Sequence, residues 1–470
     1  MEPISLADAV DWMDGTLSAS SSEGLIQSVC TDSRRALEGA LFVALKGERV
    51  DGHEFVRDAI EHGALAVVVD RVGTDSSGPA VFVRVPDTLK ALGDLAAGYH
   101  RFMQNKKKHI GLVAVTGSAG KTTTKEMIGC IISAATPCRV APESFNNEIG
   151  VPLTILGLEK CHKALVLEFA ARKAGDITRL CQIAPPDVGV ITNIGKAHLG
   201  LFGSVDAIAE AKGELLDGMC SEGTSVLNAD DAFFAQLYRC VKGDAVSFAI
   251  ERDADLQALD IRCKDGETIF DLKIPSLGDT LMPVCLPMFG IHNVYNALAA
   301  IAGAWGLGIE PCFSSDALRQ FSPPKMRMEI RSGSEGFTVI NDAYNANPSS
   351  MSVALSVLQQ AECSGRRIVV LGEMLELGSF SEEEHRAVGR ACVANGVDVV
   401  IGVGDAVWPL VDVVQSSGSI CVYHVADAEM ACSLAHETVS PGDVVLVKAS
   451  RAVGLDQVAH SLCADVCTMD

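Results

Sequence analysis

Residues 112–124 read LVAVTGSAGKTTT, an apolar run followed by a glycine-rich turn and a Lys–Thr pair. The pattern predicts a buried strand, a loop whose glycines turn backbone N–H groups toward one point, and a helix that begins near the lysine. Such a loop suits phosphates, because Lys121 neutralises charge and Thr122 offers Mg²⁺ a hydroxyl. The GxxxxGK[ST] pattern is incomplete, since Val115 stands at its first glycine. An ordinary strand-to-helix turn is the alternative, but tandem Lys and Thr have no obvious packing purpose there, which favours ATP binding.

Three further apolar runs in this region also end in polar residues. They are residues 165–167 with Glu168, residues 189–191 with Thr192 and Asn193, and residues 225–227 with the NADD sequence at 228–231. In a parallel sheet the carboxyl ends of the strands lie along one edge, where open α/β folds hold ligands. We therefore expect one shared site at that edge.

The whole chain has the composition of a multidomain globular protein. It contains 470 residues, of which 48% are hydrophobic and 21% charged, and this excludes a disordered or fibrous protein. At about 150 residues per domain, the length indicates three domains. Short β-branched runs alternate with helical patterns, which predicts βαβ units and the α/β class throughout.

Two segments predict the domain boundaries. The polar, basic stretch 101–109 is interpreted as a linker, and the prolines at 323–324 mark a second boundary. The expected domains are residues 1–108, 109–323 and 324–470. A helix is expected over residues 53–62, and the uncharged stretch 280–309 is expected to hold a buried helix in its second half. The prolines and polar residues of that stretch make it a poor membrane span.

Charge and cysteine usage restrict the partners and the compartment. With 38 Lys and Arg against 60 Asp and Glu, the formal charge of −22 opposes binding to nucleic acid or an anionic membrane. The 16 cysteines are scattered, with only Cys463 and Cys467 close together, so reduced thiols are expected. The N-terminus carries acidic residues where a signal peptide has a basic head, which predicts a cytoplasmic protein without membrane insertion.

Three polar residues near the predicted strand ends are candidates for a cation site. Glu168 alone is typical of a solvated strand end, His198 alone of a structural histidine, and Lys212 alone of an exposed helix lysine. Taken with the phosphate loop, the three suggest a site for a hard cation such as Mg²⁺.

The order of the motifs resembles that of the Mur ligases over nearly the whole chain. The motifs are TDSR, LFVALKGERVDGHEF, TGSAGKTTT, NNEIGVPLT, TNIGKAHL, AKGELL, LNADD, GIHNVYNALAA, NDAYNANPSSM, LGEMLELG and VLVKASR. The sequence looks like the MurF type, whose members use ATP to join D-alanyl-D-alanine to UDP-N-acetylmuramoyl-tripeptide through an acyl phosphate. The MurE type, which adds the third amino acid, shares TDSR and DGH but is expected to carry DNPR where this chain has NANP at 345–348.

The resemblance implies a role for each domain. The small N-terminal α/β domain would bind the UDP-sugar substrate. The central domain, a P-loop-type parallel sheet with helices on both faces, would bind ATP. The Rossmann-like C-terminal domain would close on the nucleotide and bind the incoming dipeptide. The protein would work as a monomer in cytoplasmic synthesis of peptidoglycan precursors.

The resemblance also assigns nucleotide and metal residues. The ATP-binding positions are Gly117, Ser118, Ala119, Gly120, Lys121, Thr122, Thr123, Asn293, Asn296, Arg327 and Asp342. Two Mg²⁺ ions would be held by Thr122, Glu168, His198 and Lys212, the lysine as a carbamate that supplies anionic oxygens. The catalytic residues would be Lys121, Lys212, Glu168, His198 and Arg327. Asn293 and Asn296 have an alternative interpretation as a helix cap or a polar stripe on a core helix.

The substrate residues come from all three domains. They are Ser33, Arg34 and Lys46 for the UDP-sugar, Asn146 and Asn147 in the central substrate loop, Tyr344 and Asn345 in the third domain, and Lys448, Ser450 and Arg451 near the dipeptide.

Three positions depart from the family pattern. Glu168-Phe169-Ala170 stands where Glu-Met-Gly is common, Ala449 replaces the glycine of KGSR, and Glu373 replaces an aspartate. Ala449 restricts the local backbone more than glycine would. These departures motivate a second hypothesis, a non-catalytic relative that binds nucleotide without turnover. The joint retention of Lys121, Glu168, His198 and Lys212 favours the ligase.

Overall fold

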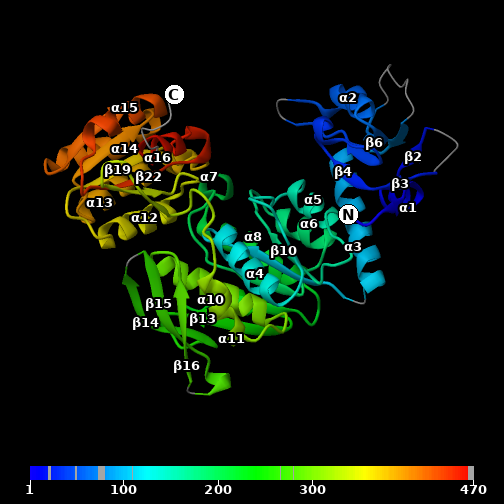
Figure 1. Cartoon of the computed structure of the whole chain (residues 1–470), viewed down its shortest axis with the longest axis horizontal. Coiled ribbons are helices and arrows are strands. Elements are labelled where there is room, and N and C mark those ends of the chain that lie inside the picture. The colour runs from blue at the N-terminus through cyan, green and yellow to red at the C-terminus, as the bar shows by residue number, and fades with distance from the viewer. Residues whose placement is uncertain are drawn as a thin grey trace.

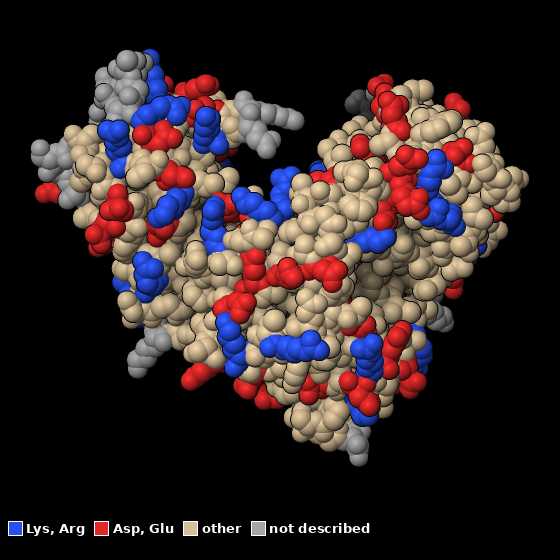
Figure 2. All heavy atoms as spheres, turned by 180° about the vertical axis from the view of Figure 1, so that it is seen from behind, with Lys and Arg blue, Asp and Glu red and all other residues tan. Residues whose placement is uncertain are grey.

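The computed structural model describes residues 1–18, 23–47, 50–71, 80–107, 109–264, 266–278 and 280–463. These residues form three α/β lobes, of which the first and the last stand apart above the central one (Figure 1). Figure 2 shows the hollow between the two upper lobes from behind.

The N-terminal lobe contains a five-stranded sheet in the order β2-β7-β6-β5-β4, with only β2 antiparallel to its neighbour. The strands are β2 (Thr16–Leu17), β4 (Ser28–Cys30), β5 (Ala40–Val43), β6 (Ala64–Val69) and β7 (Val81–Arg84). A 3₁₀ turn, Gly52–Phe55, leads into α2 (Val56–Glu61), so the helix expected over residues 53–62 is present. Outside the sheet, α1 (Leu6–Trp12) lies between β1 (Ile4–Ser5) and its partner β3 (Leu25–Ile26).

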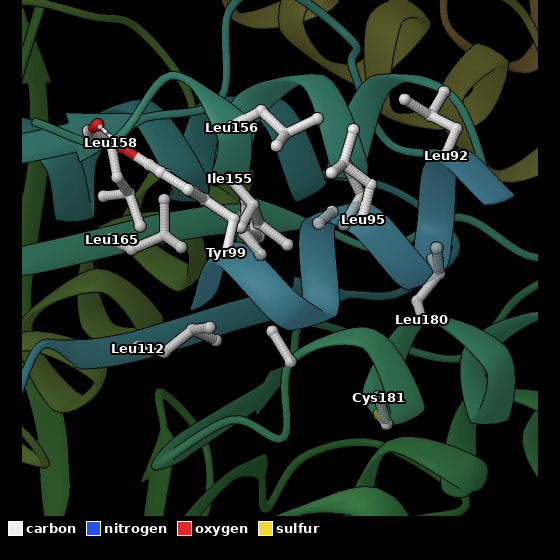
Figure 3. Close-up of a cluster of buried hydrophobic side chains, with 14 of the residues drawn as sticks. Leu92, Leu95, Tyr99, Leu112, Ile155, Leu156, Leu158, Leu165, Leu180 and Cys181 are labelled. Atoms are coloured by element: carbon white, nitrogen blue, oxygen red, sulfur yellow. Dashed lines mark hydrogen bonds between the residues drawn. The ribbon is translucent and has the colours of Figure 1, made fainter. Parts of the chain in front are cut away.

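The expected linker at residues 101–109 is wrong, because α3 (Thr88–Lys107) runs through most of it. The buried residues of α3 recur at helical spacing, from Leu92 and Leu95 to Tyr99 and Met103. Figure 3 shows this stripe against residues of α5 (Gly150–Leu156) and α6 (Asp176–Ile183). The polar residues of the segment cover the outer side of a helix that packs on the central lobe.

The central lobe contains a nine-stranded sheet in the order β16-β15-β14-β13-β12-β11-β8-β10-β9. The strands are β8 (Gly111–Thr116), β9 (Cys138–Val140), β10 (Ala164–Glu168), β11 (Val188–Ile191), β12 (Thr224–Asn228), β13 (Asp244–Ala249), β14 (Leu256–Lys264), β15 (Glu267–Lys273) and β16 (Leu281–Leu286). Neighbours from β9 to β14 pair in parallel, and β15 and β16 add an antiparallel edge.

Helices cover both faces of the central sheet, as expected. Along β8, Leu112 and Ala114 enter one core with α3, α5, α6 and α8 (Val205–Gly218), whereas Val113 and Val115 enter the other with α4 (Lys121–Ala135), α10 (Ile291–Trp305) and α11 (Pro311–Arg319). The buried helix expected near residue 300 is therefore α10. Two short helices, α7 (Leu199–Phe202) and α9 (Phe234–Tyr238), follow β11 and β12.

The C-terminal lobe contains a six-stranded sheet in the order β17-β18-β22-β19-β20-β21, in which only β17 is antiparallel. The strands are β17 (Glu329–Ser332), β18 (Thr338–Asn341), β19 (Arg367–Gly372), β20 (Val399–Val403), β21 (Cys421–Val425) and β22 (Val444–Lys448). One core includes α12 (Pro348–Gln360), α13 (Ser381–Ala394) and α14 (Trp408–Ser417), and the other includes α15 (Ala428–Thr438) and α16 (Asp456–Cys463).

The described residues can be checked for disulfides and for helices that could span a membrane. Every described cysteine is a free thiol, whereas Cys467 lies outside the described residues. Within the described part of the chain, no helix is both long and apolar enough to cross a membrane.

Candidate active site

A cavity of about 1190 Å³ lies between the central and C-terminal lobes, at the carboxyl ends of the central parallel strands. The polar residues after all four predicted strands line it, among them Ser118, Glu168, Asn193 and Asp231. The structure thus brings the four strand ends together around one cavity, at the sheet edge where a shared site is expected. The C-terminal lobe supplies the opposite wall, including Arg327.

The phosphate loop needs both of its glycines. Gly117 has a φ of 149° and Gly120 a φ of 79°, a range that residues with side chains rarely adopt. A Cβ at Gly117 would lie 1.9 Å from the Thr192 hydroxyl, and one at Gly120 would lie 2.2 Å from Asn296 Oδ1. The helix α4 begins directly afterwards at Lys121. Its N-terminal N–H groups therefore face the cavity, where an anion is favoured.

Asn193 braces this loop from the neighbouring strand end. Its side-chain carbonyl accepts the Ala119 N–H at 3.0 Å, and its amide donates to the Ala119 carbonyl at 3.1 Å. The Ser118 N–H donates to the Asn193 carbonyl at 2.9 Å. Asn193 was noticed in the sequence only as a strand-end residue, because a brace between two loops is a tertiary contact.

Lys121 lies folded back on its own loop. Its ammonium donates to the Gly117 carbonyl at 2.8 Å. Desolvation lowers the pKa of Lys121, the Glu168 carboxylate opposes this shift, and the Arg327 charge adds to it. An anionic phosphate in the cavity would relieve the cost of a partly desolvated cation.

Thr122 and Glu168 form the centre of the candidate cation site. The Thr122 hydroxyl donates to Glu168 Oε2 at 2.7 Å, and both residues are buried. The other carboxylate oxygen accepts from the Asn146 amide at 2.8 Å. Arg327 of the C-terminal lobe donates to the Thr122 hydroxyl at 2.9 Å. Residues separated by about two hundred positions thus meet at the phosphate loop.

Lys212 is buried rather than exposed. Only 2% of its surface is accessible, on the inner face of α8. Burial and the neighbouring charge of Lys121 lower the pKa of Lys212 well below its usual value. Burial therefore disfavours the charged ammonium of Lys212 relative to the neutral amine.

His198 lies at the contact between the central and C-terminal lobes. Its Nδ1 is hydrogen-bonded to one carboxylate oxygen of Glu376, and the other oxygen accepts from Arg172 at 2.6 Å. His198 and Glu376 both have a positive φ, 59° and 62°. Sequence reasoning missed Arg172 and Glu376 as site residues, although Glu376 belongs to the LGEMLELG motif.

The two asparagines at the start of α10 form a chain of hydrogen bonds. The Asn293 amide donates to the Phe289 carbonyl at 3.0 Å, and its own carbonyl accepts from Asn296 at 3.1 Å. Asn296 also accepts from the Thr124 hydroxyl at 3.3 Å. Both asparagines line the cavity, close to the phosphate loop.

The C-terminal lobe contributes a buried ion pair and an aromatic contact. Lys448, 1% exposed, donates to Asp342 Oδ2 at 2.5 Å and to the Asn345 carbonyl at 2.8 Å. The Arg327 guanidinium lies 4.1 Å from the centre of the Tyr344 ring, a cation–π contact. This stacking aims Arg327 at the phosphate loop.

Ser450 and Arg451 also line this cavity. The Ser450 hydroxyl accepts the Leu375 N–H at 2.9 Å, and Arg451 pairs with Asp456 at 3.1 Å. Ala449, which replaces the glycine of KGSR, does not have a positive φ, so its backbone conformation does not require glycine. Its side chain is fully buried beside Gly372.

Four predicted substrate residues do not line the cavity. Asn147 instead accepts the N–H groups of Ile149 and Gly150 at the start of α5. The other three belong to the N-terminal lobe: Ser33 donates to Asp58 at 3.3 Å, the exposed Arg34 pairs with Asp32, and Lys46 forms a backbone bridge with Asp51.

The donor atoms fit a hard cation only in part. Among the described residues, no group of three or more His, Cys, Asp or Glu side chains is arranged to hold a metal. Thr122 and Glu168 supply the oxygen donors that Mg²⁺ prefers, but they leave most of its positions to other ligands. Phosphate oxygens and water are the usual remaining ligands of such an ion.

Comparisons with protein families give matches in all three lobes. Residues 25–100 match the model of the Mur ligase family catalytic domain, residues 115–304 the Mur ligase middle domain, and residues 326–451 the Mur ligase glutamate ligase domain.

Individual proteins match along nearly the whole chain. The UDP-N-acetylmuramoyl-tripeptide--D-alanyl-D-alanine ligase of Bacillus subtilis is 34% identical over 93% of each chain, and that of Escherichia coli is 33% identical over 98% of this chain and 99% of its own. Among solved structures, MurF from Acinetobacter baumannii superposes with a TM-score of 0.88 at 31% identity, covering 98% of this chain and 99% of that one. MurF ligase from Thermotoga maritima, in complex with ADP, superposes with a TM-score of 0.80 at 29% identity. This match covers 93% of this chain and 97% of that one.

Proposed function

Because the chain belongs to the Mur ligase family, we propose that it is the ATP-dependent ligase that joins D-alanyl-D-alanine to UDP-N-acetylmuramoyl-tripeptide. The similarity to ligases of this specificity supports the proposal over nearly the full length. The observation that carries it is the cavity in which the phosphate loop meets Arg327, Asp342 and Lys448 of the other lobe. Phosphoryl transfer followed by attack of an amine needs both walls of such a cavity.

The proposed ATP site follows the phosphate loop. The loop N–H groups from Gly117 to Thr123 surround the phosphates, and Lys121 exchanges its bond to the Gly117 carbonyl for one to phosphate oxygen. Asn293 and Asn296 hold the adenine, and Asp342 accepts from the ribose hydroxyls. Arg327, which already reaches Thr122, neutralises charge on the phosphoryl group in transfer.

Two Mg²⁺ ions complete the proposed site. Thr122, Glu168, His198 and, as a carbamate, Lys212 would hold these ions. When bound, these ions offset the negative charge on the transferring phosphoryl oxygens.

Lys212 is proposed to be carbamylated. The unprotonated form of its amine attacks CO₂ and loses a proton, which gives an anionic carbamate with two oxygen ligands. The burial of this lysine supports the idea, because a bare ammonium at this position is strongly disfavoured.

The peptide bond forms in two balanced steps. The terminal carboxylate of the tripeptide attacks the γ-phosphorus of ATP, which forms an acyl phosphate and releases ADP. The dipeptide amine then attacks the acyl carbon, inorganic phosphate leaves, and the amine loses a proton. The C-terminal lobe excludes the water that would hydrolyse the acyl phosphate.

The proposed substrate path crosses all three lobes, taken as domains at residues 1–108, 109–323 and 324–470. The UDP-sugar occupies the N-terminal domain at Ser33, Arg34 and Lys46. The other proposed substrate residues bind the peptide end of the tripeptide substrate and the incoming dipeptide. They are Asn146, Asn147, Tyr344, Asn345, Lys448, Ser450 and Arg451. We place this monomeric enzyme in the cytoplasm, where ATP and UDP-linked precursors are available.

The test is ADP release in the presence of ATP, Mg²⁺ and the UDP-tripeptide. D-alanyl-D-alanine is supplied, omitted, or replaced by a single amino acid. Release that requires the tripeptide and the dipeptide together supports the proposal. A further mixture replaces the tripeptide by the UDP-dipeptide and supplies a single amino acid, and release there alone would instead identify a MurE-type ligase. Nucleotide binding without release in any mixture would identify a non-catalytic relative.

A further inference from the structure

Lys125 is a fully buried lysine that the proposed chemistry does not use. It lies one helical turn after Lys121 on α4, with 0% of its surface exposed. Its ammonium is 2.5 Å from the Ala141 carbonyl, 2.7 Å from the Glu143 carbonyl and 2.8 Å from the Glu126 carboxylate. A lysine ammonium has three N–H donors, so each has an acceptor here. A buried cation needs such complete pairing.

The carbonyls that Lys125 binds belong to one segment, residues 141–147, named here the 141–147 loop. Within it, Glu143 has a φ of 45°, a left-handed conformation that residues with side chains rarely adopt. The carbonyl of this same residue accepts from Lys125. Lys125 therefore holds a turn that the backbone alone would not prefer.

The 141–147 loop makes three hydrogen bonds to residues of the candidate active site. Asn146 donates to the Glu168 carboxylate at 2.8 Å, and its own carbonyl accepts the Ala170 N–H at 2.9 Å. The Ser144 hydroxyl accepts from the Tyr344 hydroxyl of the C-terminal lobe. Displacement of the loop would change the orientation of Glu168 and the contact with the other lobe together.

We propose that Lys125 is a positioning residue for the ligase reaction, which holds the 141–147 loop so that Asn146 orients Glu168 and Ser144 meets Tyr344. Lys125 itself touches neither substrate. The catalytic part of this inference rests on the proposed function, whereas the loop-holding part rests on the contacts alone.

The first experiment compares Lys125→Met with wild type in the full chain. Methionine keeps an unbranched side chain but removes the ammonium. Amide hydrogen exchange at Phe145 and Ala170 should become about tenfold faster or more, whereas exchange at Thr124 in α4 should not change. Exchange at Phe145 and Ala170 that equals wild type would overturn the proposal.

Turnover gives the second readout. Lys125→Met should lower kcat about a hundredfold, the loss expected when a catalytic group moves by about 1 Å, with ADP affinity kept within about twofold. Lys90→Met is the matched control, because Lys90 is an exposed lysine on α3, and it should keep wild-type turnover. A loss of ADP affinity as large as the loss of kcat would overturn the proposal, since Lys125 would then support the phosphate loop instead.

A double-variant comparison identifies the route of the effect. If Lys125 acts through Asn146, the double variant Lys125→Met/Asn146→Ala should have a kcat close to that of the less active single variant. Combined with Asn293→Ala, whose side chain bonds Phe289 and Asn296 rather than the 141–147 loop, the same change should multiply the losses. Multiplying losses with Asn146→Ala would contradict the proposal.

Two precautions keep the outcomes distinct. If Lys125→Met does not fold, Lys125→Gln retains two N–H donors, and it should show the same pattern of exchange and turnover with smaller changes. If wild type releases no ADP, the proposed function fails, and the exchange data at Phe145 and Ala170 still decide whether Lys125 holds the loop.

Discussion

At the scale of single residues, Lys212 shows how the fold changes the chemistry of a side chain. In the sequence it has the pattern of an exposed helix lysine, yet the packing of α8 leaves it only 2% exposed. Composition and spacing identify residue types, but they do not identify which helix face becomes buried. The motif order singled out Lys212, and the structure shows that this lysine is buried.

The first prediction concerns carbamylation of this residue. Wild-type protein equilibrated with ¹³C-bicarbonate should show a ¹³C carbamate resonance in its NMR spectrum, and Lys212→Met should lack it and lose about a hundredfold or more in turnover. A wild-type spectrum without this resonance, from protein that is fully active, would contradict the carbamate.

His385 gives a prediction about pH. Burial lowers the pKa of His385 from 6.5, whereas the bond that its Nδ1 donates to the Ser381 carbonyl at 2.7 Å opposes this shift. Its Nε2 accepts the Met374 N–H at 3.1 Å. Below the unfolded pKa the unfolded chain binds the proton more readily than the native protein does, so protonation favours unfolding. This contribution to stability is complete above about pH 7 and falls as the pH decreases through 6.5.

Urea titrations at a series of pH values test this dependence. Between pH 7.5 and 5.5 the free energy of unfolding should decrease more for wild type than for His385→Gln, whose amide can make similar bonds without titrating. Parallel pH profiles for the two proteins would show that His385 is not responsible.

At the scale of elements, the sequence predicts strands better than the connections between them. β8 and its neighbours were recognisable because buried parallel strands are short, continuous apolar runs bounded by polar residues. Segment 101–109 was mistaken for a linker because only one face of α3 is apolar, and its last turns present mostly polar residues. Gln104 connects this helix to β8 through two hydrogen bonds with Ile110, contacts that no local pattern reveals.

Tyr99 tests how strongly α3 is attached to the central lobe. Its hydroxyl donates to the Leu158 carbonyl at 2.7 Å and accepts the Glu2 N–H at 2.7 Å, and its side chain is fully buried (Figure 3). Tyr99→Phe should lower the free energy of unfolding by about 1–3 kcal/mol, because both partners lose a hydrogen bond. Urea unfolding measures the change. Tyr238→Phe, at an exposed tyrosine, is the control and should be neutral, and equal effects of the two changes would refute this role.

At the scale of the whole molecule, the site depends on how two lobes meet. Arg172, Lys196 and His198 of the central lobe pair with Glu376 or Glu384 of the C-terminal lobe. Gly200 and Gly378 approach closely beside them, since a Cβ on Gly200 would lie 2.5 Å from the Gly378 nitrogen. No sequence pattern gives these pairs, because they join residues about two hundred positions apart. Many residues of each cavity wall were named from the sequence, but Arg172, Glu376 and the contact between the walls were not.

Glu376→Asn should loosen this contact. Asparagine tolerates the positive φ of Glu376 but is shorter and uncharged, so the bonds to His198 and Arg172 are lost. Small-angle X-ray scattering should show a larger radius of gyration, and turnover should fall about tenfold. Glu382→Asn, at an exposed position on α13, is the control and should change neither quantity. An unchanged radius for Glu376→Asn would show that these bonds do not hold the lobes together.

The proposed reaction forms a peptide bond in this cavity by activating a carboxylate with ATP. The most direct measurement uses UDP-N-acetylmuramoyl-tripeptide labelled with ¹⁸O in its terminal carboxylate, together with ATP, Mg²⁺ and D-alanyl-D-alanine. Mass spectrometry then follows the phosphate and the nucleotide-linked product. Each released phosphate should carry one ¹⁸O. The mass of the product should exceed that of the labelled tripeptide substrate by the mass of the dipeptide minus one molecule of labelled water. Unlabelled phosphate, or ADP release without the ligated product, would contradict it.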